Sequence, residues 1–216
     1  MRLPGTGNQA RNDYLYCQDV KITSGGTAQI VLPKSISRSF LFLQNLDVGP
    51  MTLEFGSARA TCTITNGAVT SVTVTNAGFG YSQPPIVRFL GGGPGDTIPQ
   101  VPSGQGSPFI GGSQPNYPAP SNFAQAHCVM TGSAPNLSVS SITIDNPGAL
   151  YLRAPYVFLD NSPLDPYGAA VPSSTVGILL PSGSPAMIFN GTCCPTDAVS
   201  VWSPNTNASL VARWMD

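Results

Sequence analysis

The sequence of 216 residues contains little charge, because Asp, Glu, Lys and Arg together make up only 9% of it. An ordinary soluble domain has about 25% charged residues. Nine basic and ten acidic residues leave a formal charge of −1, so no basic field exists to recruit nucleic acid or an acidic membrane surface. Such a composition is typical of a protein whose surface is covered by neighbouring proteins.

Long apolar segments are also missing from the sequence. No run of about 18 apolar residues is present to span a bilayer. The first ten residues, MRLPGTGNQA, lack the apolar core of a signal peptide. We therefore expect a protein that is made in a cytoplasm.

The residues that most often carry chemistry are scarce. His127 is the single histidine, and the five cysteines include no Cys-x-x-Cys spacing. They are Cys17, Cys62, Cys128, Cys193 and Cys194. A metal site needs further ligands at regular spacing, and a Ser-His-Asp or Cys-His centre needs a suitably placed histidine. We expect free, mostly buried thiols, no cofactor, no metal site and no catalytic residue, and hence a protein that is not an enzyme.

Two acidic residues, Asp160 and Asp165, leave more than one interpretation open. Paired carboxylates near a turn can serve a glycosidase or bind calcium. Asp before Ser or Pro is also a common turn former, and the alternating ligands of a calcium loop are missing. The structural turn is the favoured interpretation. The glycine-rich segment 91–95 lacks the Lys-Ser/Thr ending of a phosphate-binding loop.

Glycine and proline are abundant, with 23 and 22 residues respectively. Both residues interrupt helices and shape turns. The sequence therefore predicts an all-β fold of short strands joined by many turns.

An internal repeat is the most informative feature of the sequence, because residues 72–90 and 142–159 align without a gap. The matching pairs are Val72 with Ile142, Val74 with Ile144, Asn76 with Asn146, Gly78 with Gly148, Tyr81 with Tyr151, Pro85 with Pro155, and Val87 with Val157. Upstream, Cys62 matches Cys128. One supersecondary unit is thus predicted to occur twice.

The repeat predicts its own local structure. Strict alternation in residues 71–75 and 141–145 is typical of a strand with one buried face. Asn-Ala-Gly and Asn-Pro-Gly then predict turns. Tyr81 and Tyr151 are expected to cover the core beneath these turns, and Pro85 and Pro155 to introduce a second strand.

The flanking sequences predict a second β domain. Segments 39–45 and 51–55 resemble one hairpin, and segments 198–202 and 209–214 resemble another. Packing two such sheets face to face is expected to bury Phe40, Phe42, Leu53, Val199, Val201 and Val211.

We therefore predict a discontinuous β-sandwich or barrel from residues 21–58 and 173–216, preceded by an N-terminal arm, 1–20. An inserted region, 59–172, is expected to hold the two β-repeats, 60–91 and 126–161, and a long Gly/Pro-rich loop, 92–125.

The first repeat resembles a known bacteriophage motif. Residues 67–87, GAVTSVTVTNAGFGYSQPPIV, are similar to a β-repeat widespread in tailed-bacteriophage virion proteins. Residues 31–45, VLPKSISRSFLFLQN, look like small phage head proteins of the capsid-decoration or cement type. The second copy departs from the motif, because Ala149 and Leu150 replace the glycine-rich step before Tyr151, which leaves the form of its turn open.

This resemblance implies a β-rich virion structural protein on the capsid surface, without a cofactor, that stabilises the shell. The partners it implies are the major capsid protein and further copies of the chain, as a dimer or trimer, with neither nucleic acid nor membrane. The predicted interface residues are Tyr14, Leu15 and Tyr16 in the arm and Phe109 and Tyr117 in the loop.

The alternative is a tail-fibre or receptor-binding module that recognises carbohydrate on the host surface. Exposed aromatic residues near acids provide a platform for a sugar, and Tyr156 and Tyr167 beside Asp160 and Asp165 are the candidates. A secreted hydrolase domain is the third possibility, which the missing signal peptide and the single histidine disfavour.

Overall fold

The computed structural model describes residues 16–92, 123–161, 165 and 167–215. Strands dominate this part of the chain, and the helical element within it is a short 3-10 turn, Gly191–Cys193. The all-β prediction is therefore confirmed. The chain divides into two compact units. The first combines the chain up to Phe55 with the segment from Pro172 onward, and the second is Gly56–Val171.

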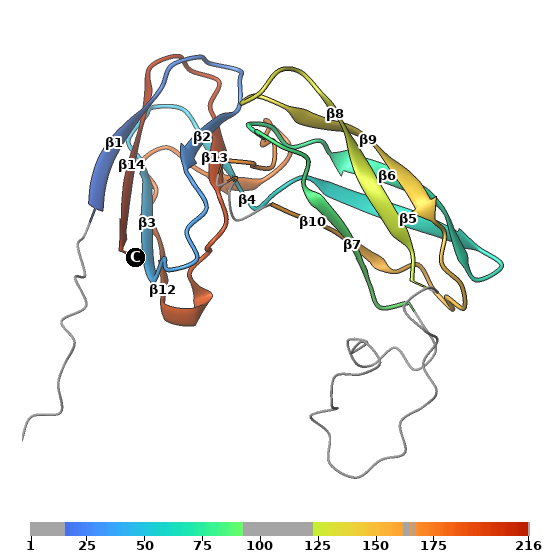
Figure 1. Cartoon of the computed structure of the whole chain (residues 1–216). Helices are drawn as coiled ribbons and strands as arrows, with labels where there is room; N and C mark the ends of the chain where they lie inside the picture. The colour runs from blue at the N-terminus through green and yellow to red at the C-terminus, as the bar shows by residue number, and fades with distance from the viewer. Residues whose placement is uncertain (1–15, 93–122, 162–164, 166, 216) are drawn as a thin grey trace, which may run out of the picture. The chain divides into compact units, whose positions relative to one another are not determined.

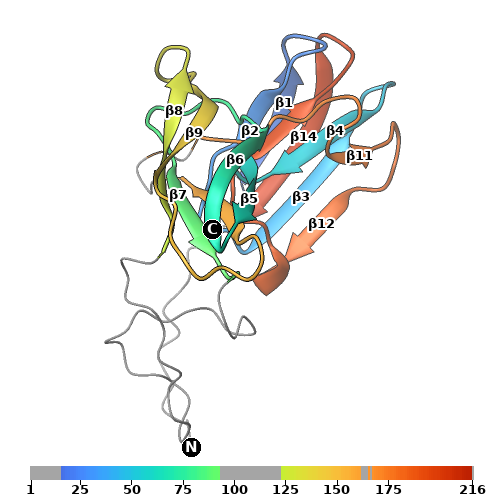
Figure 2. The ribbon, with the colours of Figure 1, turned by 90° about the vertical axis from the view of Figure 1, so that its right-hand side faces the viewer.

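The first unit contains two antiparallel four-stranded sheets (Figures 1 and 2). One sheet has the order β1 (Tyr16–Ile22), β14 (Ala208–Met215), β3 (Phe40–Asn45) and β12 (Met187–Asn190). The other has the order β11 (Ile178–Leu180), β4 (Met51–Phe55), β13 (Val199–Trp202) and β2 (Gln29–Leu32). Strands from the two ends of the chain therefore alternate within each sheet.

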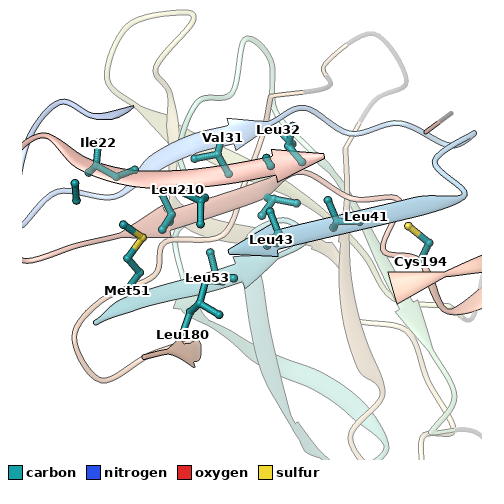
Figure 3. Close-up of a cluster of buried hydrophobic side chains, with 14 residues drawn as sticks. Ile22, Val31, Leu32, Leu41, Leu43, Met51, Leu53, Leu180, Cys194 and Leu210 are labelled. Atoms are coloured by element: carbon teal, nitrogen blue, oxygen red, sulfur yellow. The ribbon is translucent and has the colours of Figure 1, made fainter. Parts of the chain in front are cut away.

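One hydrophobic core joins these sheets, as Figure 3 shows. Leu41 and Leu43 of β3 pack in it with Leu53 of β4. The expectation that Phe40 and Phe42 point into this core is wrong. The alternation of β3 turns them to the opposite face, where the Arg213 guanidinium lies 5.4 Å from the centre of the Phe42 ring.

The two expected hairpins are also wrong, because each predicted pair of strands is divided between the two sheets. Strand β3 pairs with β14, and β4 pairs with β13. The connection from β3 to β4 and the connection from β13 to β14 therefore each cross from one sheet to the other. Asn205 in the second connection donates a hydrogen bond to Asp47 in the first at 2.7 Å. The core therefore receives apolar side chains from both strands of each predicted pair, one strand in each sheet.

Part of the predicted arm, residues 16–20, lies in a sheet strand. Strand β1 pairs with β14 from Tyr16 opposite Trp214 to Ile22 opposite Ala208. Residues 16–20 therefore belong to the sheet, because the long strand β14 offers backbone partners along this whole stretch.

The second unit is one antiparallel six-stranded sheet in which the repeat copies exchange strands (Figure 1). Its order is β6 (Ala68–Asn76), β5 (Arg59–Thr65), β10 (Tyr156–Asp160), β7 (Ile86–Leu90), β8 (Gln125–Thr131) and β9 (Ser138–Asn146). Each copy supplies a hairpin and a third strand. Strand β7 of the first copy pairs with β8 of the second, and β10 of the second copy pairs with β5 of the first.

Equivalent backbone bonds draw the two ends of this sheet together. The Val69 N–H donates to the Pro147 carbonyl at 2.9 Å, and the Val139 N–H donates to the Ala77 carbonyl at 2.9 Å. Aligning one copy on the other converts each bond into the other, so the unit has internal two-fold pseudosymmetry. The two bonds connect the edge strands, and the sheet forms a nearly closed barrel.

Tyr81 and Tyr151 are buried in this barrel, as the repeat predicts. The Ala58 N–H donates to the Tyr81 hydroxyl at 2.7 Å, and the Ala124 N–H donates to the Tyr151 hydroxyl at 2.8 Å. Each ring therefore fills the core and satisfies a backbone donor just before the first strand of its own copy.

The turn before each tyrosine is shared by both copies. Asn76 and Asn146 accept bonds from the backbone of Gly78 and Gly148, at 3.0 and 2.9 Å. Leu150 has φ 66°, close to the 76° of Gly80 at the equivalent position. The second copy therefore keeps the turn although it lacks the glycine.

Candidate functional site

Of the predicted interface residues, Tyr16 is the one within the described part of the chain. Its ring stacks on Trp214, with ring centres 5.4 Å apart and planes inclined by 17°. Tyr14, Leu15, Phe109 and Tyr117 lie outside the described residues. Tyr16 is thus the first residue of a sheet strand, with one ring face against its own chain.

The single histidine forms an exposed side-chain pair. His127 Nδ1 lies 2.8 Å from Asp145 Oδ1 on the neighbouring strand β9. In the described part of the chain, no group of three or more His, Cys, Asp or Glu side chains is placed to hold a metal ion. The exposure of His127 and its contact with Asp145 agree with the solvent-facing, hydrogen-bonded interpretation of this residue.

The cysteines are free, but they are less buried than expected. Cys128 and Cys194 are buried, Cys62 is half-buried, and Cys17 and Cys193 are exposed. Burial raises the pKa of the Cys128 thiol to about 11, so this thiol remains protonated near neutral pH and is a poor nucleophile.

The two acids predicted to lie near a turn have separate environments. Asp165 is buried, and its Oδ2 accepts backbone bonds from Ser82 and Gln83 at 2.7 and 3.2 Å. Asp160 is partly exposed and lies 3.6 Å from Arg88. The structural interpretation of Asp165 is confirmed, because its carboxylate holds the segment after Tyr81.

The outer surface of β7 and β10 carries an unusual concentration of exposed apolar side chains. We define the β7–β10 face as the three cross-strand pairs Tyr156/Leu90, Phe158/Arg88 and Asp160/Ile86. Tyr156 is 77% exposed, Phe158 and Ile86 are each 51% exposed, and Leu90 is 47% exposed. These side chains therefore present a contiguous apolar surface, whereas scattered single apolar residues are normal on proteins.

Strand alternation produces this face. Val157 and Leu159 of β10, and Val87 of β7, pack in the barrel core, so the residues between them point outward. Pro85 and Pro155 immediately precede these strands, where the missing N–H costs no ladder bond.

Polar residues border the β7–β10 face on both sides. Arg59 of β5 lies opposite Phe158, and His127 of β8 lies opposite Ile86. Farther out, exposed hydroxyls cover β5 and β6, and Thr63 Oγ1 lies 2.8 Å from Ser71 Oγ. An apolar centre with a polar border is the arrangement of a protein-binding surface.

Sequence reasoning identified only part of this face. It singled out Tyr156 and Asp160 as an aromatic platform beside an acid, but it missed Ile86, Leu90 and Phe158. It also grouped them with Asp165, which is buried, and with Tyr167, which is exposed. The alternation of β10 was available as a signal, but the sequence alone does not say which of two apolar faces is covered.

A scan of protein-family models, a search of curated proteins and a search of solved structures each found no match to this chain. Within the described residues, no helix has the length and apolar character needed to cross a membrane.

Proposed function

We propose that the chain is a bacteriophage virion structural protein, a capsid decoration or cement protein that binds the major capsid shell and stabilises it. The observation that carries this proposal is the exposed apolar β7–β10 face in a chain with only 9% charged residues. Apolar side chains on a regular sheet favour covering by another protein surface.

The fold supports this role in a second way. The first unit has one hydrophobic cluster between its two sheets, and the barrel of the second unit holds two hydrophobic clusters. The repeat that resembles the phage motif forms the barrel carrying the β7–β10 face. The proposed partners are the major capsid protein and further copies of the chain.

The copy number in purified phage particles tests the proposal. A decoration protein occupies every equivalent site of a symmetric shell, so we expect on the order of hundreds of copies per particle. Purified protein is also expected to co-sediment with expanded capsids that lack it. Absence of the chain from particles, or a copy number of only a few, contradicts the proposal.

A tail-fibre or receptor-binding module is the second candidate, and one observation favours it. Tyr156 and Phe158 are exposed aromatic rings on the same strand as Asp160, whose carboxylate lies beside Arg88. Aromatic rings beside hydrogen-bonding groups suit a sugar. Glycan-array binding by the wild-type protein that Tyr156→Ala abolishes favours this candidate over decoration.

A further inference from the structure

We propose that the β7–β10 face binds the same face of a second copy of this chain, forming a weak symmetric dimer. The proposal rests on the proposed structural role, in which copies of the chain are arrayed side by side. It adds which surface the copies share and what chemistry joins them.

The balance of charge on the β7–β10 face favours a second copy of the chain as its binding partner. Its six side chains comprise four apolar groups, one cation, Arg88, and one anion, Asp160. A nucleic acid or another strongly charged partner gains nothing from a surface whose charges cancel. Arg88 and Asp160 lie 3.6 Å apart within the face, so a partner that covers it well must offer apolar area without net charge, and the same face on a second copy has this composition.

The pairing of β7 with β10 places one aromatic ring and one cation at the centre of the face. The repeat alignment exchanges β7 with β10, so the direct pair Phe158/Arg88 lies at the centre of the face. A two-fold contact between copies uses the same surface on both subunits. With the axis along the strands, Phe158 of each copy faces Arg88 of the other, which is a cation–π arrangement, and Tyr156 faces Leu90. Asp160 faces Ile86, two residues along the strand from Arg88 of the other copy.

The size of the face sets the strength of the contact. Its two strands, β7 and β10, at about 4.8 Å spacing and five residues long at about 3.3 Å each, cover roughly 160 Å² of flat sheet. A stable complex buries about 800 Å² per partner. We therefore expect association only at high protein concentration in solution, and stronger association where a shell holds the copies close together.

Sedimentation velocity of the full chain, from micromolar to millimolar concentration, measures this association. We expect wild-type protein to form a dimer reversibly, and Phe158→Glu to weaken the dimer at least about tenfold, as removal of a central interface residue does. Val48→Glu is the control, because Val48 is also an exposed apolar residue, 89% exposed, but lies in the first unit.

A pair of charge variants tests whether the face binds itself. Arg88→Asp leaves the face with two acids, and Asp160→Arg leaves it with two bases. Each variant alone is expected to dimerise about tenfold more weakly than wild type, whereas an equimolar mixture is expected to recover association through opposite charges. Circular dichroism of each variant checks that the sheet is intact.

A monomer at millimolar concentration overturns the self-association proposal, as does a dimer that Val48→Glu weakens as much as Phe158→Glu. Failure of the mixed variants to associate, when each alone is monomeric, also overturns it. These outcomes are separate from the particle-content test. If the chain is abundant in virions but monomeric in solution, the proposed structural role stands and the self-association proposal is wrong.

Discussion

The two repeat copies share one internal design but carry different outer surfaces. Inside the barrel, Tyr81 and Tyr151 are buried and each accepts a backbone bond from an alanine. Outside, the hairpin of the first copy carries mostly hydroxyls, whereas that of the second copy carries the His127–Asp145 pair. Packing therefore fixes the inner positions, and the outer positions are available for recognition.

The copies also differ in how tightly their tyrosines are enclosed. A side chain at Gly78 or Gly168 would approach the Tyr81 ring to 2.7 or 2.3 Å. At Tyr151, a side chain at Gly92 would approach the ring to 3.1 Å. Tyr81 is thus held between two glycine backbones.

Truncating the two tyrosines is the most severe test of their equivalence. Tyr81→Ala and Tyr151→Ala are each expected to lower the free energy of unfolding by about 3 to 5 kcal/mol, as the loss of a buried aromatic ring does. Tyr81→Ala should cost more, because its ring is fully buried between glycines. Urea denaturation followed by tyrosine and tryptophan fluorescence measures both values, and a larger loss for Tyr151→Ala contradicts the ranking.

The pH dependence of stability at alkaline pH reports on the buried Tyr81 hydroxyl, because only the hydroxyl of this side chain ionises. Burial raises the pKa of Tyr81 to about 12, against an ordinary value of 10.0, although the bond from Ala58 opposes the shift. The neutral Tyr81 hydroxyl therefore contributes its full share to the free energy of unfolding below pH 10, and this share is lost as pH rises from 10 to about 12. The expected loss is about 2 to 3 kcal/mol.

The matched variant for this prediction is Tyr81→Phe. It removes the titrating group, and it lowers stability at neutral pH by about 1 to 3 kcal/mol because the Ala58 N–H loses its acceptor. Cys128 also has a raised pKa and titrates in a neighbouring range, so the measured quantity is the difference between wild type and Tyr81→Phe at each pH. A difference that does not change between pH 10 and 12 contradicts the prediction.

The positive φ at Leu150 is a smaller difference between the copies. Leu150 adopts φ 66° where the first copy has Gly80 at φ 76°, and the left-handed region costs an L-residue about 1 to 2 kcal/mol. Since the Leu150 side chain is exposed, Leu150→Gly is expected to raise stability by up to about 1 kcal/mol after the added entropy of the unfolded chain is counted. Gly80→Ala is the matched opposite change and is expected to destabilise.

Sequence periodicity predicted strands well and strand partners poorly. Alternation and the Asn-x-Gly turns located β6 and β9, and the repeat predicted that Tyr81 and Tyr151 are equivalent. The same alternation could not distinguish a hairpin from a crossing between sheets, since both satisfy an apolar face. The pairing of β3 with β14 depends on contacts between segments far apart in the chain.

The candidate site had the same limitation. Tyr156 and Phe158 alternate with Val157 and Leu159, so both faces of β10 look apolar in the sequence. Only the exchange of third strands, which places β10 between β5 and β7, decides that Val157 and Leu159 are covered. Exposure of the β7–β10 face is thus a property of the assembled barrel.

The smallest expected effect concerns the His127–Asp145 pair, which occurs in one copy only. Both side chains are about half exposed, and exposed ion pairs contribute about 0 to 1 kcal/mol. Replacing the pair by the first copy's residues, with His127→Thr and Asp145→Thr, is therefore expected to change stability by less than about 0.5 kcal/mol, and less again in high salt. The reciprocal change, Thr61→His with Thr75→Asp, should be equally small, because the strand register shifts at equivalent places in both hairpins. A loss above 1 kcal/mol in the first variant, measured by urea denaturation, would mean that the outer face of the second copy contributes to folding and is not free for recognition.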